Sequence, residues 1–97
     1  MADAVSVAPD QYKVLLENDR VRVLETRYSP GAKSDVHSHP DLVGIALTPA
    51  KARLSLTDGD PIDLEFQAGG SFFIEAQEHS VENTGTSEFL VIPVELK

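Results

Sequence analysis

The residues of this chain whose type and spacing could do chemistry are its three histidines. His37 and His39 stand two positions apart, whereas His79 lies far along the sequence. On an extended strand the side chains of residues i and i+2 point to the same side, so the rings of His37 and His39 could bind one ion together. Neutral imidazole is the commonest protein ligand for transition metals. The histidines therefore predict a metal site if a closed fold brings His79 to the other two. The alternative is that all three are ordinary surface or partly buried side chains.

Length and composition limit how such a site could be built. The chain has 97 residues, which is enough for one domain. Its 16 acidic residues outnumber its 8 basic ones, and the net charge of -8 argues against nucleic acid or an anionic membrane as a partner. There is no cysteine, so disulfides and thiolate ligands are excluded and any metal must use nitrogen and oxygen ligands.

The sequence carries no pattern that marks a membrane span or an export signal. It contains no run of about 20 apolar residues that could cross a bilayer. Residues 1–10 lack the basic and apolar regions of a signal peptide. We therefore expect a cytoplasmic protein.

The spacing of apolar residues predicts strands along the whole chain. Short apolar segments alternate with turn signals such as Asn18-Asp19 and Asp58-Gly59, and no segment has a sustained helical period. Strands are expected at 12–17, 20–28, 42–48, 51–57, 62–66, 71–75, 79–83 and 89–96. This pattern predicts an all-β domain, a sandwich or small barrel, at residues 12–97. Residues 1–11 are expected to form a flexible N-terminal arm or a strand swapped onto a partner.

Two stretches of the sequence resemble the two motifs of the cupin superfamily. Gly31, five further residues and His37-Ser38-His39-Pro40 resemble the first motif, in which a glutamate follows three or four residues later. His79, followed after three residues by Asn83, resembles the end of the second motif. The resemblance covers roughly residues 12–96 and implies a single-domain jelly-roll β-barrel, the double-stranded β-helix. It also implies that His37, His39 and His79 bind one divalent transition metal, which could be Fe, Zn, Ni, Mn or Cu.

The chain departs from the cupin pattern where the fourth ligand should stand. Val43 or Gly44 occupies the position of the motif glutamate, and neither can bind a metal. Glu75-Ala76-Gln77-Glu78 replaces the usual proline and glycine before the second-motif histidine. What remains is similar to the cupin dioxygenases that hold Fe(II) on three histidines. The fourth position would then be filled by water, by substrate or by a nearby carboxylate.

Four polar residues are candidates for that fourth ligand or for support of the histidines. Asp41 and Glu75 could supply a carboxylate, whereas Gln77 and Asn83 could fix a histidine tautomer by hydrogen bonding. The alternative for the two acids is a solvated surface position. The alternative for Asn83 is a turn residue before Thr84-Gly85.

The apolar residues that continue the phase of the histidines are expected to line a pocket. Val43, Ile45 and Leu47 keep the parity of His37 and His39. Phe73, or its neighbour Phe72, and Val81 would add to that wall. Such a pocket suits a small, partly apolar organic ligand. The alternative is that these residues are simply barrel core.

These observations leave several functions open. The sharpest is a dioxygenase-like metalloenzyme acting on a small organic molecule, and isomerase or lyase chemistry is a further possibility. The alternatives are a non-catalytic module that binds or senses a small molecule, and a metal-free dimeric scaffold. The run Phe89 to Ile92 is apolar on both faces, which predicts a covered outer face and hence a homodimer. Because imidazole must be neutral to bind, metal should be released as the pH falls toward and below about 6.

Overall fold

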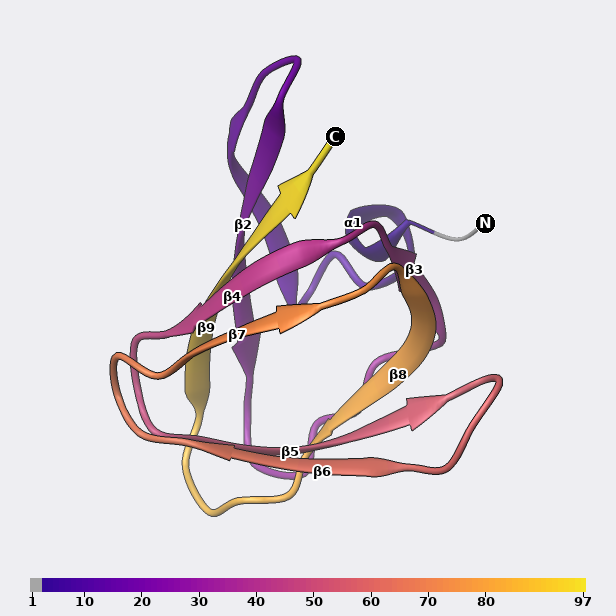
Figure 1. Ribbon diagram of the computed structural model, residues 1–97. Helices are drawn as coiled ribbons and strands as arrows, with labels where there is room; N and C mark the ends of the chain where they lie inside the picture. The colour runs from indigo at the N-terminus through magenta and orange to yellow at the C-terminus, as the bar shows by residue number, and fades with distance from the viewer. Residues whose placement is uncertain (1–2) are drawn as a thin grey trace.

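The computed structural model describes residues 3–97, and its strands form two antiparallel sheets that close into a barrel (Figure 1). The five-stranded sheet has the order β1-β2-β9-β4-β7 and the four-stranded sheet the order β3-β8-β5-β6. The strands are β1 (Tyr12–Glu17), β2 (Val21–Tyr28), β3 (His37–His39), β4 (Leu42–Ala46), β5 (Ala50–Leu56), β6 (Ile62–Phe66), β7 (Ser71–Ile74), β8 (Gln77–Asn83) and β9 (Phe89–Leu96). The all-β jelly-roll barrel expected from the sequence is confirmed.

The corner between β3 and β4 decides which side chains face the barrel interior. Pro40 and Asp41 separate the two strands, and these strands belong to different sheets. Residue parity is therefore not carried across the corner. After it, Leu42 and Ala46 are buried, whereas Val43 and Ile45 point outward. The alternation in β4 is thus opposite in phase to the one that the histidines suggested.

Gly44 in β4 allows an aromatic ring to lie flat against the inner face of the sheet. It is paired with Phe72 of β7, and a Cβ atom at this position would lie 2.2 Å from the Cζ atom of that ring. Any larger residue would therefore displace Phe72, which stacks on Phe66 of β6 with ring centroids 4.7 Å apart. This aromatic contact joins the two sheets on the side of the barrel away from β3.

The described part of the N-terminal segment packs against its own barrel. A single helical turn, α1 (Ala4–Val7), precedes β1, and Ala4 and Ala8 are buried in the core. Asp3 forms an isolated bridge with Ser38 of β3. The structure thus places residues 3–11 on the barrel, where the sequence suggested a flexible arm or a swapped strand. Residues 1 and 2 of that segment lie outside the described residues. No helix within residues 3–97 is long and apolar enough to cross a membrane.

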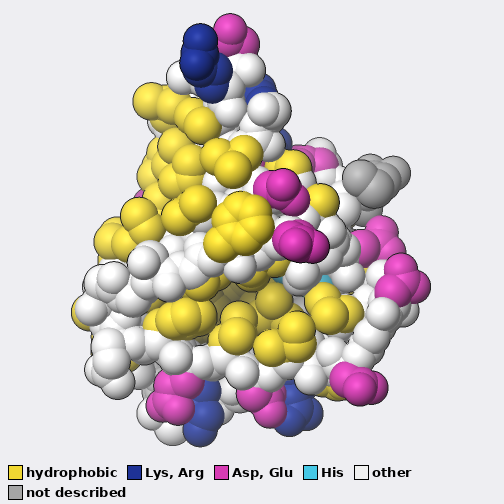
Figure 2. All heavy atoms as spheres, in the orientation of Figure 1, with side chains coloured by type: hydrophobic (Ala, Val, Ile, Leu, Met, Phe, Trp, Pro, Cys, Tyr) yellow, Lys and Arg dark blue, Asp and Glu magenta, His cyan; other side chains and the backbone are white. Residues whose placement is uncertain are grey.

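The outer face of the five-stranded sheet carries a row of apolar side chains. Register places Leu16, Val23, Val94, Val43 and Phe73 side by side across all five strands. Phe73 is 57% exposed and Leu16 is 50% exposed. Figure 2 shows apolar side chains gathered over this sheet in the upper part of the view. We call these five residues the outer ladder.

Candidate metal centre

The pairing of β3 with β8 brings the three histidines together. His37 and His79 are direct partners in the antiparallel register, and His39 follows on the same face of β3. Their ring centroids form a nearly equilateral triangle, with sides of 4.9, 5.0 and 5.2 Å. One nitrogen from each ring lies within 4.8 Å of the other two, and all three side chains are buried. The convergence predicted from the sequence is therefore confirmed.

Hydrogen bonds to the Nδ1 atoms fix the same tautomer in all three rings. His37 Nδ1 lies 2.8 Å from the carbonyl oxygen of Asp35, and His79 Nδ1 lies 2.7 Å from the side-chain oxygen of Gln77. His39 Nδ1 lies 2.6 Å from a carboxylate oxygen of Glu95. Each of these oxygens accepts, so each Nδ1 donates its proton and each Nε2 presents a lone pair. This is the arrangement in which neutral histidines bind a metal.

Burial keeps two of these imidazoles neutral. It lowers the pKa of His37 below its usual value. Burial and the two neighbouring histidines together lower the pKa of His79 to about 3. Both rings therefore remain unprotonated at physiological pH, as a metal ligand must.

The donor set fits a divalent transition metal. Three imidazole nitrogens leave open coordination positions, as in catalytic sites. Around an ion with bonds of 2.0–2.1 Å, tetrahedral ligand nitrogens lie roughly 3.4 Å apart. The histidine nitrogens are separated by up to 4.8 Å, so the rings would draw together slightly around an ion.

Two tyrosines occupy the space beside this donor set. The hydroxyl of Tyr12 in β1 lies 3.2 Å from His37 Nε2, and the hydroxyl of Tyr28 in β2 donates to it over 3.0 Å. Burial raises the pKa of Tyr12 well above its usual value and also raises the pKa of Tyr28, so both phenols keep their protons. Tyr12 therefore donates to the lone pair that would bind a metal. Metal binding at His37 must replace this hydrogen bond.

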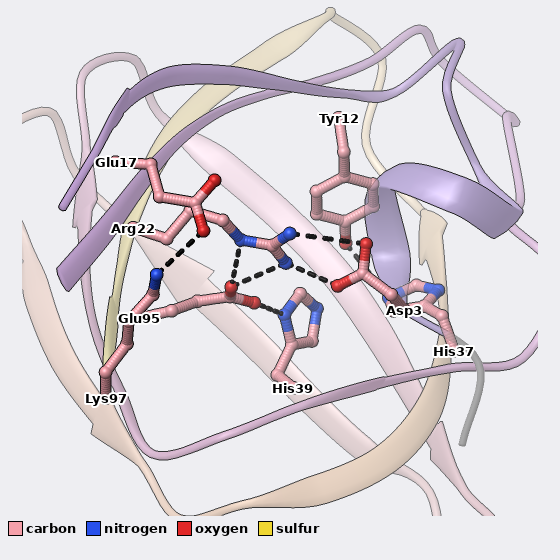
Figure 3. Close-up of polar contacts among 8 residues, drawn as sticks. All are labelled: Asp3, Tyr12, Glu17, Arg22, His37, His39, Glu95 and Lys97. Carbon is pink, nitrogen blue, oxygen red and sulfur yellow. Dashed lines mark hydrogen bonds and ion pairs between the residues drawn. The ribbon is translucent and has the colours of Figure 1, made fainter. Parts of the chain in front are cut away.

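A series of charged groups that runs from the buried Glu95 to the partly exposed Asp3 holds His39 on the side away from the other histidines (Figure 3). Glu95 in β9 accepts from His39 with one carboxylate oxygen and from Arg22 of β2, at 2.7 Å, with the other. Arg22 also donates to Asp3 in the N-terminal segment. Glu95 is only 2% exposed, so its charge depends on these two partners for compensation. These contacts fix the orientation of His39. Through Asp3, the N-cap residue of α1, they also connect the N-terminal segment to the histidine site.

Two of the histidines, His39 and His79, line an apolar cavity inside the barrel. Its volume is about 80 Å³, room for a handful of water molecules or a small organic molecule. The wall is apolar except for His39, His79, Tyr12, Tyr28 and Thr26, and no Asp, Glu, Lys or Arg side chain of residues 3–97 lines it. Figure 2 looks into this hollow, which is surrounded by apolar side chains. Residues from both sheets form the wall, among them Leu54, Leu64, Phe66, Phe72, Ile74 and Val91.

Most of the residues expected to line the pocket lie elsewhere. Val81 does line the cavity. For Val43, Ile45, Leu47 and Phe73 the expectation is wrong, because all four are exposed and none lies among the cavity-lining residues. For Val43, Ile45 and Leu47 the reason is the corner at Pro40-Asp41, which resets the parity of β4. In β7 it is Phe72, opposite Gly44, that turns inward.

The four polar candidates have different positions in the structure. Gln77 contacts His79, in agreement with a supporting role. The Asp41 carboxylate accepts from the backbone N–H of Ala76, 2.8 Å away, and so closes an exposed corner. Glu75 is exposed. Asn83 donates to the carbonyl oxygens of Tyr28 and Ser87 and organises the turn after β8. None of these contacts gives Asp41, Glu75 or Asn83 a place beside the histidines.

Four residues at the site did not stand out in the sequence. Glu95 is an acidic residue at a position of β9 that shares the inward phase of the buried residues Phe89 and Val91. An acidic side chain at an inward position is unusual and could have identified Glu95 as part of a site. Thr26 and Tyr28 similarly share the inward phase of Leu24 in β2. Tyr12 carries no local signal, because it begins its strand and its role depends on a contact with β3.

Comparisons with known proteins agree with this architecture. No family model matches the chain. The β-alanine degradation protein BauB of Pseudomonas aeruginosa is 34% identical over 86 residues, which are 87% of this chain and 90% of that protein. The crystal structure of a cupin domain from Bordetella pertussis Tohama I has a TM-score of 0.79 and 31% identity, covering 89% of this chain and 91% of that one. A conserved Klebsiella pneumoniae protein with a double-stranded β-helix domain has a TM-score of 0.69 at 23% identity, covering 88% and 74% of the two chains. The chain therefore belongs to the cupin superfamily.

Proposed function

We propose that this cupin binds one divalent transition metal on His37, His39 and His79 and uses it to act on a small organic molecule. The observation that carries the proposal is that three buried imidazoles share one tautomer, with their Nδ1 atoms engaged behind them. Three separately buried histidines would have no reason to direct three Nε2 lone pairs to one point, and only that of His37 accepts a hydrogen bond there, from Tyr12.

The chain's own residues would bind the ion, orient the rings and exclude water. Glu95, Gln77 and the carbonyl of Asp35 hold the rings at their Nδ1 atoms, so each Nε2 is directed before any ion arrives. The apolar wall limits access of bulk water to the open positions. Bound there, a redox-active ion such as iron would supply oxygen activation, and any divalent ion would supply Lewis-acid chemistry.

Among enzymatic activities, dioxygenase-like chemistry is favoured over isomerase or lyase chemistry. Removal of a proton from a substrate carbon needs a positioned base. No carboxylate or lysine of residues 3–97 lines the cavity, and Tyr12 and Tyr28 keep their protons. The metal would therefore have to supply the chemistry. Oxygen activation depends less on a neighbouring acid or base than isomerase or lyase chemistry does.

A non-catalytic role in binding or sensing a small molecule is the second candidate. The same lack of a general base in the cavity wall favours it, because a binding site needs only shape and a few polar groups. Oxygen consumption by the Fe(II)-loaded protein in the presence of substrate separates the two. No consumption with any ligand that binds would favour the binding module.

The relative BauB directs the choice of test compounds. Its name describes a β-alanine degradation protein, which supports a three-carbon amino acid or a compound made from it as ligand here. The described cavity wall has no carboxylate to pair with an ammonium group. We therefore expect compounds in which an uncharged oxygen group replaces the amine to bind better than β-alanine itself.

Metal analysis of protein purified without a histidine tag tests the proposal. We expect close to one divalent ion per chain, and His79→Ala should lose most of it. Glu78→Ala, a change at the neighbouring position in β8, is the matched control and should keep the metal. A wild-type chain that takes up no ion from a panel of Fe, Zn, Ni, Mn and Cu would refute the proposal. Retention of the ion by His79→Ala would refute the three-histidine assignment.

A further inference from the structure

Thr26 in β2 has a hydroxyl group that the protein leaves without a partner. Among residues 3–97 its Oγ1 is the buried side-chain atom for which no hydrogen bond is found. The residue is only 5% exposed and lies in the wall of the cavity. Burying a hydroxyl group without a partner costs free energy, and native proteins avoid it where no ligand is involved. Replacement by valine would remove that cost without changing the shape of the side chain.

The position of Thr26 relates this unpaired hydroxyl to the metal centre. Thr26 is the cross-strand partner of Tyr12, whose hydroxyl contacts His37. Tyr28 follows two residues later on the same face and donates to Tyr12. Three hydroxyl groups thus line one wall of the cavity. Tyr28 donates to Tyr12 and Tyr12 donates to His37, whereas the Thr26 hydroxyl is left for a group that enters the cavity.

We propose that Thr26 binds a neutral oxygen of the ligand whose carboxylate binds the metal. The ligand class is a short hydroxy- or oxo-carboxylic acid. The inference rests on the proposed function, because an ion on three neutral imidazoles would be the positive charge that faces the cavity. An anionic group therefore belongs at the metal. Away from the metal no charged side chain lines the wall, so the group near Thr26 must be uncharged. A hydroxyl can donate or accept, which suits either an alcohol or a carbonyl oxygen.

Two variants separate this role from a purely structural one. Thr26→Val keeps the β-branched shape and removes only the hydroxyl, whereas Thr26→Ser keeps the hydroxyl and removes the methyl group. In metal-free protein we expect Thr26→Val to unfold at the same denaturant concentration as wild type or a higher one. A clear fall in its midpoint would show that the hydroxyl already has a partner in the free protein, and would overturn the inference.

Binding to the zinc-loaded protein, measured by calorimetry, tests the ligand class. We expect 3-hydroxypropanoate to bind wild type roughly three- to tenfold more tightly than propanoate, which lacks the hydroxyl. Thr26→Val should lose this preference and Thr26→Ser should keep it. An equal preference in wild type and Thr26→Val would refute the assignment of Thr26 while leaving the metal site intact.

The metal content of each sample distinguishes the failure of this inference from the failure of the proposed function. If wild type holds zinc but shows no preference between the two acids, only the role of Thr26 is refuted. If wild type holds no ion, the proposed function is refuted together with the carboxylate position. The stability of metal-free Thr26→Val then still decides whether the hydroxyl is unpaired.

Discussion

The two faces of the five-stranded sheet each carry an exception to the usual pattern of an antiparallel sheet: polar groups lie within the mostly apolar inner face, and apolar groups lie on the outer face. Its inner face carries the hydroxyl groups of Tyr12, Thr26 and Tyr28 and the buried carboxylate of Glu95. Its outer face carries the apolar outer ladder from Leu16 to Phe73. In most such sheets the apolar side faces the core and the polar side faces water.

This difference shows what each face serves. The polar groups inside hold the histidines and, in our proposal, bind a ligand, whereas the surrounding apolar residues of both sheets provide a core. Apolar groups are placed outside at a cost in solubility unless another surface covers them. We therefore relate the inner face to the histidine site, and we expect the outer face to be covered by a partner.

The largest effect is expected from Glu95→Ala on the inner face. The change leaves Arg22 with only Asp3 to balance its charge and leaves His39 Nδ1 without its acceptor. Removing one partner of a buried ion pair costs about 3–5 kcal/mol. The free energy of unfolding, measured by urea denaturation, should fall by this amount. Glu88→Ala, which removes an exposed partner of Arg27, is the control and should change it by less than about 0.5 kcal/mol. Equal effects of the two changes would contradict a special role for the inner face.

The outer ladder is expected to be covered by a second copy of the chain. Its five side chains carry no charge, although the whole chain has a net charge of -8. Two copies can therefore pack here without repulsion between like charges at the centre of the interface. Phe73→Asp would place two carboxylates in that interface. We expect it to weaken dimerisation a hundredfold or more, on the order of 3 kcal/mol, as measured by sedimentation equilibrium.

A matched change on the other sheet controls for this prediction. Ile62 of β6 is also apolar and is 41% exposed, but it lies outside the outer ladder. Ile62→Asp should leave the oligomeric state unchanged. A wild-type protein that stays monomeric at high concentration would refute the dimer, and the outer ladder would then need another partner.

The stability of the metal-free protein should fall as the pH is lowered below about 6.5. The pKa of His79 is about 3 in the folded protein, so between these values the unfolded chain binds a proton that the folded chain does not. The free energy of unfolding should therefore decrease by at most roughly 1.4 kcal/mol per pH unit for this residue. Denaturation with a chelator present measures it, and His79→Gln should flatten the profile. A rise in stability toward acid would contradict the assignment. The same burial also moves the expected metal release below the value of about 6 suggested by the sequence.

The smallest effect is expected from removing the Tyr12 hydroxyl. That hydroxyl competes with an ion for the Nε2 lone pair of His37, so Tyr12→Phe should bind zinc roughly three- to tenfold more tightly. Competition with a coloured chelator measures the affinity. Tyr28→Phe is the control, because the Tyr28 hydroxyl reaches only Tyr12 in that chain of contacts. Weaker binding by Tyr12→Phe would show instead that the phenol is itself a ligand.

Much of the fold and half of the site could be predicted from the sequence. Alternating apolar residues and turn signals gave the strands, because their two-residue period is a local property of extended chain. The spacing of His37 and His39 likewise gave two rings on one face. The same local reasoning failed at Val43 and Ile45, because it carried a phase through the corner at Pro40-Asp41, where the chain leaves one sheet for the other.

The sequence by itself determined an all-β chain with three candidate ligands and neither thiols nor a basic surface. Only the tertiary structure decided that His37 and His79 are cross-strand partners, because register depends on how whole strands pack. Only the tertiary structure placed Glu95 behind His39 and Tyr12 and Thr26 in the cavity wall, since these residues lie on strands far from β3 in the sequence. A residue's type and parity are local properties, whereas the groups it meets depend on long-range contacts between strands.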